Sequence, residues 1–256
     1  MNISSCYTWT TETKRENNKL LPKSIRGLII GKSSCGKTTL LLNLLLKPGW
    51  LDYDHLKVFG KSLHQKEYKI LKAGFENGLS KEQITNIFEN QELFHKKGIN
   101  PIDAIIDCNI DNKNKISAEF YDNCNDIPDP SELNPNEKNV MIFDDCILEK
   151  QSKAEAYYTR GRHNNCDSFY ISQNYFLLPR KTIRENANFI IMFPQDDKNL
   201  NHIHKDHCTD MSLVEFKLFC RKCWESKHNF VTIDLSSEKY NGKYRCNFNM
   251  FYISNS

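Results

Sequence analysis

The sequence lacks an apolar run long enough to cross a membrane, and it lacks a large excess of charge of either sign. Its longest apolar stretch, Leu40–Leu46, is interrupted by Asn43, whereas a transmembrane helix needs about 20 apolar residues. The formal net charge is +3 and the mean hydropathy is −0.62. A membrane-spanning protein is therefore not expected, and any nucleic-acid-binding surface must be local.

The sequence also lacks internal repeats and the apolar segment of a secretory signal peptide, because residues 1–18 are polar. Cysteine is abundant instead, with 10 residues spread along the chain. Without a signal for secretion, free thiols in a reducing compartment are expected rather than a disulfide framework. We therefore expect an intracellular protein.

A glycine-rich motif lies between a short, mostly apolar run, Ile25–Ile30, and a helix-favouring run, Thr39–Leu46. The motif fits Gly, four residues, Gly-Lys-Ser/Thr and reads Gly31-Lys32-Ser33-Ser34-Cys35-Gly36-Lys37-Thr38, followed by Thr39. In such a phosphate-binding loop (P-loop), successive backbone N–H groups hold the phosphates of a nucleotide. Lys37 is expected to reach the β- and γ-phosphates, and the Thr38 hydroxyl to ligate Mg²⁺. The motif predicts a site for ATP and Mg²⁺. A position at the helix N-terminus could lower the pKa of the Cys35 thiol, but the stronger interpretation of Cys35 is a tolerated loop residue.

A second apolar run, Asn139–Cys146, delivers two adjacent carboxylates, Asp144 and Asp145. Ligands of open α/β sheets bind beyond the carboxyl ends of the strands. Asp144 is therefore predicted to hold Mg²⁺ through water, and Asp145 to polarise the attacking water. The next strand runs into Gln173, which is predicted to bond the γ-phosphate or orient the water. The alternative for Gln173 is a turn or N-cap role.

Basic residues lie on both sides of this strand. The segment Tyr158–His163 carries Arg160 and Arg162 and is expected at the edge opposite the nucleotide. An arginine there would act on a neighbour's ATP in a ring, as an arginine finger worth about 10³–10⁵ in rate; a solvated basic loop is the alternative. Three more basic residues after Gln173 are expected to contact phosphates or DNA, or to form a solvated face: Arg180, Lys181 and Arg184.

The alternation of strands and helices predicts an α/β fold of the P-loop NTPase class, with a mostly parallel sheet and helices on both faces. The expected strands are Ile25–Ile30, Leu56–Gly60, Ile102–Ile106, Ser117–Tyr121, Asn139–Cys146, Asp167–Ile171 and Asn188–Phe193. The expected helices are Thr39–Leu46, Gln65–Phe75, Lys81–Phe94, Leu148–Arg160 and Arg180–Asn186. We expect a flexible arm over residues 1–23, an ATPase core over 24–200 with an irregular region at 98–138, and a C-terminal extension over 201–256 packed on the core.

The C-terminal segment Cys220–Cys223 has the C-x-x-C spacing of a zinc site. Other candidate ligands are near in sequence: His202, His204, His207 and Cys208. The stronger interpretation is the buried face of a helix, because Leu213, Phe216, Cys220 and Cys223 follow one another at intervals of three and four residues.

The order of these motifs resembles the FtsK/HerA superfamily of DNA-pumping ATPases. It is most similar to the poxvirus-type genome-packaging ATPases of Polinton (Maverick) elements and related viruses, and the resemblance covers most of residues 25–235. The further stretches that carry it are Leu178–Asn188, Gly161–Asn165, Phe120–Asn123, Asp126–Pro130, Gln195–Leu200 and His207–Trp224.

The resemblance implies a homo-oligomeric ring, a hexamer, that hydrolyses ATP to drive double-stranded DNA into a capsid at a portal-like vertex, in the host cytoplasm or nucleus where virions assemble. It also implies that Arg162, eleven residues before the sensor Gln173, is the trans-acting arginine. Many family members have Glu where this chain has Asp145. Two alternatives stay open: another nucleic-acid P-loop ATPase, such as a helicase or transposition ATPase, and a non-catalytic nucleotide-binding scaffold.

Overall fold

The computed structural model describes residues 8–10, 20–107 and 116–253. Its strands are β1 (Thr8–Thr10), β2 (Arg26–Ile30), β3 (His55–Gly60), β4 (Ser117–Tyr121), β5 (Asn139–Asp144), β6 (Cys166–Ser172), β7 (Phe189–Met192), β8 (Val231–Asp234), β9 (Tyr244–Cys246) and β10 (Met250–Ile253). Its helices are α1 (Lys37–Leu46), α2 (Lys66–Glu76), α3 (Lys81–Glu89), α4 (Gln91–Lys96), α5 (Pro101–Asp107), α6 (Ser152–Arg160), α7 (Asp197–His207) and α8 (Leu213–Cys223). Short helical turns are η2 (Cys124–Asp126), η3 (Pro130–Glu132), η4 (Gly161–Asn164), η5 (Arg180–Arg184) and η6 (Lys239–Lys243).

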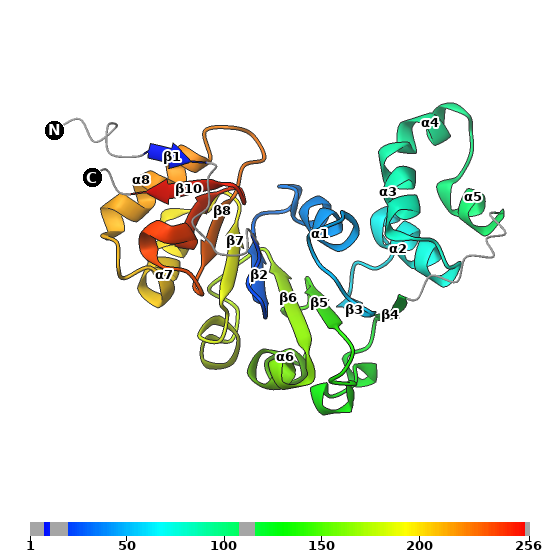
Figure 1. Ribbon diagram of the computed structural model, residues 1–256, viewed down its shortest axis with the longest axis horizontal. Helices are drawn as coiled ribbons and strands as arrows, with labels where there is room; N and C mark the ends of the chain where they lie inside the picture. The colour runs from blue at the N-terminus through cyan, green and yellow to red at the C-terminus, as the bar shows by residue number, and fades with distance from the viewer. Residues whose placement is uncertain (1–7, 11–19, 108–115, 254–256) are drawn as a thin grey trace.

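In the described residues these strands form one ten-stranded sheet in the order β1-β10-β9-β8-β7-β2-β6-β5-β3-β4. Every pair from β7 to β4 is parallel, and every pair from β7 to β1 is antiparallel. Helix α1 covers one face and α6 the other (Figure 1). The predicted α/β fold, with a mostly parallel sheet and helices on both faces, is confirmed.

Each central strand is buried on both faces, so its apolar side chains divide between two cores. In β2, Leu28 and Ile30 pack in the core that contains Tyr157 of α6, whereas Ile29 packs in the core that contains the leucines of α1. This alternation is the period-two pattern of a strand. The parallel strands are therefore nearly continuous apolar runs in the sequence, and this is why they could be predicted from it.

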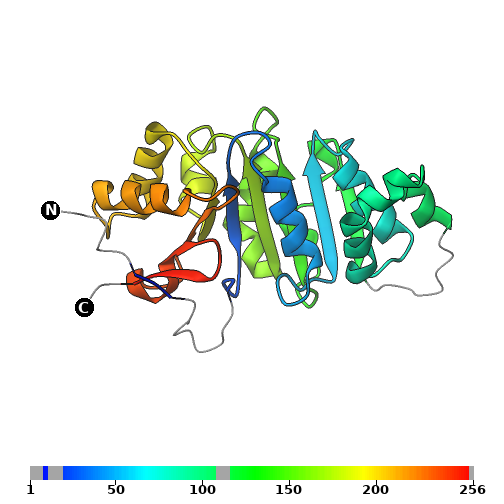
Figure 2. The same ribbon diagram turned by 90° about the horizontal axis from the view of Figure 1, so that it is seen from above.

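A helical lobe, α2–α5, connects β3 to β4 and lies at one end of the molecule (Figure 1, Figure 2). The prediction of a strand at Ile102–Ile106 is wrong, because these residues lie in α5. Pro101 begins this helix, where its fixed φ and missing N–H are tolerated. The Asn100 side chain accepts a hydrogen bond from the Ile102 N–H (3.1 Å), as an N-cap does.

Two predicted helices have different bounds in the structure. The helix expected over Lys81–Phe94 is divided at Asn90, which ends α3 and precedes α4. The helix expected from Leu148 begins only at Ser152, because the Gln151 amide donates to the carbonyls of Cys146 and Glu149 and closes a turn before it. The region 98–138, which was predicted to be irregular, contains α5, β4, η2 and η3.

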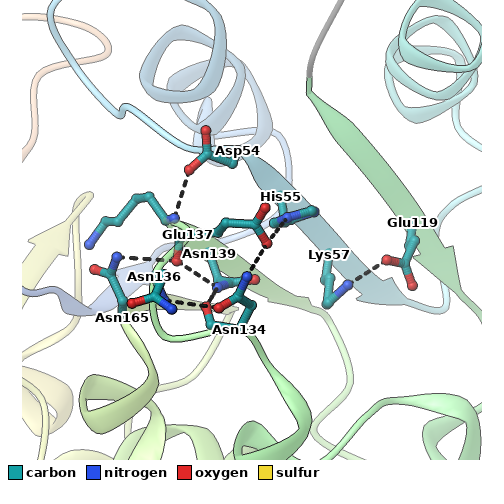
Figure 3. A network of polar contacts seen from close by, with 10 residues as sticks. Asp54, His55, Lys57, Glu119, Asn134, Asn136, Glu137, Asn139 and Asn165 are labelled. Carbon is teal, nitrogen blue, oxygen red and sulfur yellow. Dashed lines mark hydrogen bonds and ion pairs between the residues drawn. The ribbon is translucent and has the colours of Figure 1, made fainter.

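Asparagine side chains order the segment before β5 (Figure 3). The Asn139 amide donates to the carbonyls of Asn134 and Glu137, at 3.2 and 2.9 Å, and the Asn165 amide also donates to the Glu137 carbonyl. The Glu137 carboxylate lies 2.9 Å from the His55 ring at the start of β3. Side chains therefore satisfy backbone groups that regular structure leaves unpaired, as asparagine commonly does in turns.

The C-terminal region adds α7, α8 and the antiparallel strands β8, β9 and β10 at the end opposite the α2–α5 lobe (Figure 2). Phe216, Phe219, Cys220 and Cys223 are the buried residues of α8, which confirms the interpretation of this segment as the buried face of a helix. In the part of the chain that the structure describes, His, Cys, Asp and Glu side chains form no group of three that could hold a metal ion, and no helix is long and apolar enough to span a bilayer.

A buried ion pair joins β8 to β9. The guanidinium of Arg245 bonds the Asp234 carboxylate, and both side chains are fully buried. Arg245 also donates to the carbonyls of Gly242 (2.7 Å) and Leu20 (2.6 Å), so it ties the residues before β2 to the C-terminal strands.

We predict that Arg245→Met destabilises the fold by about 3–5 kcal/mol, because Asp234 would remain buried without its cation. Equilibrium denaturant unfolding measures this loss. Arg160→Met is the matched control, since Arg160 pairs with Asp129 at the surface (3.0 Å) and such pairs contribute at most about 1 kcal/mol. A loss no larger than that of the control would contradict the role assigned to Arg245.

Candidate nucleotide site

A cleft of about 680 Å³ opens beyond the carboxyl ends of β2, β5 and β6. It collects most residues that the sequence predicted for a nucleotide site, although these come from three separate segments. From that prediction the lining includes Ser33, Ser34, Cys35, Gly36, Lys37, Thr38, Thr39, Asp144, Asp145 and Gln173. Gly31 and Lys32 do not line the cleft, and Arg162 lies elsewhere.

The loop after β2 approaches its neighbours so closely that it requires glycine. A Cβ on Gly31 would lie 2.5 Å from the Cys35 sulfur and 2.8 Å from the Phe193 Cβ, which no side chain tolerates. Gly36 has a φ of 109°, a conformation that favours glycine. The Gly31 N–H donates to the Ser172 carbonyl (3.1 Å) and anchors the loop to β6. The loop is thus a compact backbone cradle at the start of α1, which suits an anion.

The Lys37 ammonium bonds this loop directly. Its Nζ donates to the carbonyl oxygens of Gly31 (2.7 Å) and Lys32 (2.8 Å). The lysine therefore places one positive charge at the cradle, where a phosphate would be neutralised. Burial raises the pKa of the Cys35 thiol and outweighs the opposing effects of Lys37 and backbone hydrogen bonds. The alternative of a lowered pKa is therefore wrong, and the result agrees with Cys35 as a tolerated loop residue.

The two carboxylates at the end of β5 have different environments. Asp144 is 6% exposed and accepts a hydrogen bond from the Tyr68 hydroxyl, whereas Asp145 is exposed at the cleft with a φ of 50°. Burial raises the pKa of Asp144, and the Tyr68 hydrogen bond opposes that rise. Together with the half-buried Thr38 hydroxyl, Asp144 supplies the hard oxygen ligands that Mg²⁺ prefers, so these residues fit the predicted ion.

Gln173 follows β6 and is exposed in the cleft. The turn at this point is made by its neighbours: the Ser172 hydroxyl bonds both the N–H and the carbonyl of Asn174 (3.2 and 3.1 Å). The Gln173 amide contacts no other described residue by a hydrogen bond. Its side chain therefore has all its donors and acceptors available to a ligand.

The arginines of the Tyr158–His163 segment lie at the other edge of the sheet. Arg160 ends α6 and pairs with Asp129 (3.0 Å), whereas the exposed Arg162 has no ion-pair partner among the described residues. The seven-residue β6 lies between this edge and Gln173. At roughly 3.3 Å per residue, the strand separates the two by about 20 Å. Arg162 is thus out of reach of its own cleft.

The basic residues after Gln173 do not line the cleft. Arg180 and Lys181 are exposed, but Arg184 is 5% exposed and lies 3.3 Å from the Asp206 carboxylate. Its guanidinium also lies over the Tyr175 ring. For Arg184 the interpretation as a solvated face is therefore wrong, because the side chain is buried, and the contact with phosphates or DNA stays a prediction.

Several cleft residues were not predicted from the sequence. Phe193 follows β7, and His228 and Phe230 come from the connection between α8 and β8. Tyr68 of α2 does not line the cleft but bonds the Asp144 carboxylate. None belongs to a motif. Only the position of Phe193, the last residue of the predicted strand Asn188–Phe193, could have indicated a place at the ligand edge of the sheet.

Comparisons with known proteins identify the fold. No protein-family model matches the sequence, and no curated protein matches it. Among solved structures, the genome packaging NTPase B204 from Sulfolobus turreted icosahedral virus 2 in complex with AMP aligns with a TM-score of 0.51 at 12% identity, over 89% of this chain and 98% of that chain. The DNA-packaging ATPase B204 from Sulfolobus turreted icosahedral virus aligns with a TM-score of 0.50 at 15% identity, over 86% and 95% of the two chains.

At these identities the likeness shows the fold and nothing more. The fold is that of P-loop ATPases, and its structural neighbours are genome-packaging ATPases, as the resemblance in the sequence indicated. The alignments cover nearly the whole of the neighbouring chains, so the likeness extends beyond the nucleotide motif itself.

We predict that Tyr68→Phe lowers ATP turnover roughly tenfold at limiting Mg²⁺, because Asp144 would lose the donor that orients its carboxylate. The buried ring is retained, so the fold should persist. The loss should shrink as Mg²⁺ is raised, since excess cation compensates for weaker binding. Steady-state hydrolysis over a Mg²⁺ series measures both effects.

Tyr53→Phe is the matched control for this experiment. Tyr53 is also buried, but its hydroxyl donates to the Leu45 carbonyl (2.9 Å) and not to a carboxylate of the cleft. Equal losses in the two variants, or a Tyr68→Phe loss that is independent of Mg²⁺, would show that Tyr68 does not orient Asp144.

Proposed function

We propose that the protein is an ATPase that moves double-stranded DNA into a capsid. One observation carries this proposal: a single cleft brings together a phosphate cradle, two adjacent carboxylates and an exposed amide. Nucleotide complexes of B204, with AMP and with AMPPCP, support a nucleotide as the ligand of this fold.

In this proposal, the backbone N–H groups of the loop and Lys37 hold the phosphates of ATP in place. Thr38 and Asp144 would hold Mg²⁺, which neutralises phosphate charge when bound. Asp145 accepts a proton from the attacking water, because it is the exposed carboxylate of the pair. Gln173 orients that water or bonds the γ-phosphate with its free amide.

Arg162 acts on the cleft of a neighbouring copy in a homo-oligomeric ring, proposed to be a hexamer. Its exposure and its lack of an ion-pair partner among the described residues favour it over Arg160, which Asp129 already engages. A guanidinium that enters the neighbour's cleft would stabilise the charge that develops on the phosphates. Hydrolysis in one subunit would then depend on the position of the next.

Double-stranded DNA is the proposed substrate of the ring, and a capsid or portal-like vertex in the infected host cell its destination. The neighbours named as packaging enzymes support this part. The small net charge of +3 indicates that phosphate contacts are concentrated on a limited surface, such as the lining of a ring.

We predict that long double-stranded DNA stimulates ATP hydrolysis severalfold, and that Lys37→Ala abolishes turnover with or without DNA. Phosphate release with duplex, single-stranded or no DNA measures this. Stimulation by single strands alone would favour a helicase. Bound ATP without turnover in any condition would favour a nucleotide-binding scaffold.

We further predict that Arg162→Ala abolishes turnover and leaves ATP binding intact, because the arginine acts on another subunit's ATP. Arg160→Ala, which changes the neighbouring arginine, is the control and should retain most activity. Normal turnover by Arg162→Ala would refute the assignment.

Mixing inactive subunits tests the action in trans. Lys37→Ala retains Arg162 but lacks the phosphate lysine, and Arg162→Ala has the opposite defect. Mixed rings should therefore recover part of the activity, because some interfaces combine an intact Arg162 with an intact loop. No recovery, in rings shown to be mixed, would argue that both residues act within one chain.

A further inference from the structure

We infer that the aromatic end of the cleft is a nucleobase subsite, in which the His228 ring stacks on the base. This inference rests on the proposed function, since it requires ATP to occupy the cleft. It assigns a role to His228, Phe230 and Phe193, which line the cleft but take no part in the phosphate chemistry.

The two ends of the cleft differ in chemistry. The loop follows β2, which lies between β6 on one side and β7 on the other. Asp144, Asp145 and Gln173 end β5 and β6, on the first side. Phe193 follows β7, and Phe230 precedes β8, which pairs with β7 on the second side. A nucleotide whose γ-phosphate lies toward the carboxylates therefore extends its base toward β7 and β8.

The aromatic end is a rigid wall. Phe193 and Phe230 are 2% and 8% exposed, and their ring centroids lie 5.6 Å apart. Phe248 packs edge-on against Phe230 at 4.9 Å and stacks on Phe189. An apolar wall of this kind suits the flat, poorly hydrated face of a base, and it offers nothing to a phosphate.

His228 lines the same cleft as this wall, and its side chain is exposed. Its φ is 68°, a conformation uncommon for residues other than glycine. Such conformations persist where the surroundings fix them, and they gather at ligand sites. An exposed imidazole held in a cleft is a surface on which a base can stack.

The surroundings that fix His228 are a set of asparagine hydrogen bonds. The Asn229 amide donates to the Cys223 carbonyl (3.0 Å) and accepts from the Asn247 amide (3.0 Å). The Asn247 side-chain oxygen accepts from the Phe230 N–H (3.2 Å), and the Asn247 N–H donates to the Phe230 carbonyl (2.7 Å). The turn after β9 thereby locks the His228 loop beside the cleft before a ligand arrives, which lowers the entropy lost on binding.

The test substitutes His228→Asn, because asparagine tolerates a positive φ and so removes the ring without straining the backbone. We expect ATP to bind roughly tenfold more weakly to this variant, the effect of losing one stacking ring. Inorganic tripolyphosphate, which has no base, should bind it as it binds the wild type. Calorimetric titrations with each compound, in the presence of Mg²⁺, measure both.

The control is His95→Asn, an exposed histidine of α4 outside the cleft, which should change neither affinity. Unchanged ATP binding by His228→Asn would overturn the base subsite. Equal weakening of ATP and tripolyphosphate would overturn it too, because His228 would then act on the phosphates or the fold. Wild-type protein that binds neither compound would refute the proposed function itself, and the subsite with it.

Discussion

The close contact of the Gly31 loop with β6 and Phe193 is the constraint on which the cleft depends. Because Gly31 has no side chain, its N–H reaches the Ser172 carbonyl and the loop closes against the end of β6. The β5–β6 pairing sets Asp144 opposite Ile171, so the carboxylates end beside the same edge. Phe193 both packs against the loop and begins the aromatic wall. The close approach of the Gly31 backbone to β6 and Phe193 thus brings the phosphate-binding loop, the carboxylates and the aromatic wall of the cleft together.

Segments outside the central strands complete the cleft from both sides. From the α2–α5 lobe, Glu67 lines the cleft and the Tyr68 hydroxyl bonds the buried Asp144, and the C-terminal region contributes His228 and Phe230. The lobe is therefore linked to the carboxylate end, and the antiparallel strands to the aromatic end. A movement of either segment would change the geometry of the cleft, so the proposed function would have two places where nucleotide state could be coupled to motion.

The sequence predicted those parts that depend on local pattern. The glycine spacing around Lys37 and the apolar runs before Gly31 and Asp144 identify the loop, the strands and the shared edge, because parallel strands are buried on both faces. Ile102–Ile106 was misassigned because a short apolar run carries no helical or strand period, and the signal lay in Asn100 and Pro101 before it. Tyr68 and His228 escaped prediction for another reason. Their roles come from contacts with distant segments, for which a single sequence holds no marker.

The structure of the protein with Mg²⁺ and a non-hydrolysable ATP analogue tests the central claim most directly. The account predicts phosphates on the Gly31–Thr38 loop beside Lys37, the metal between Thr38 and Asp144, the γ-phosphate toward Gln173 and the base against His228. A nucleotide bound outside this cleft, or one whose base lies toward Asp145 and whose phosphates lie toward Phe230, would contradict it.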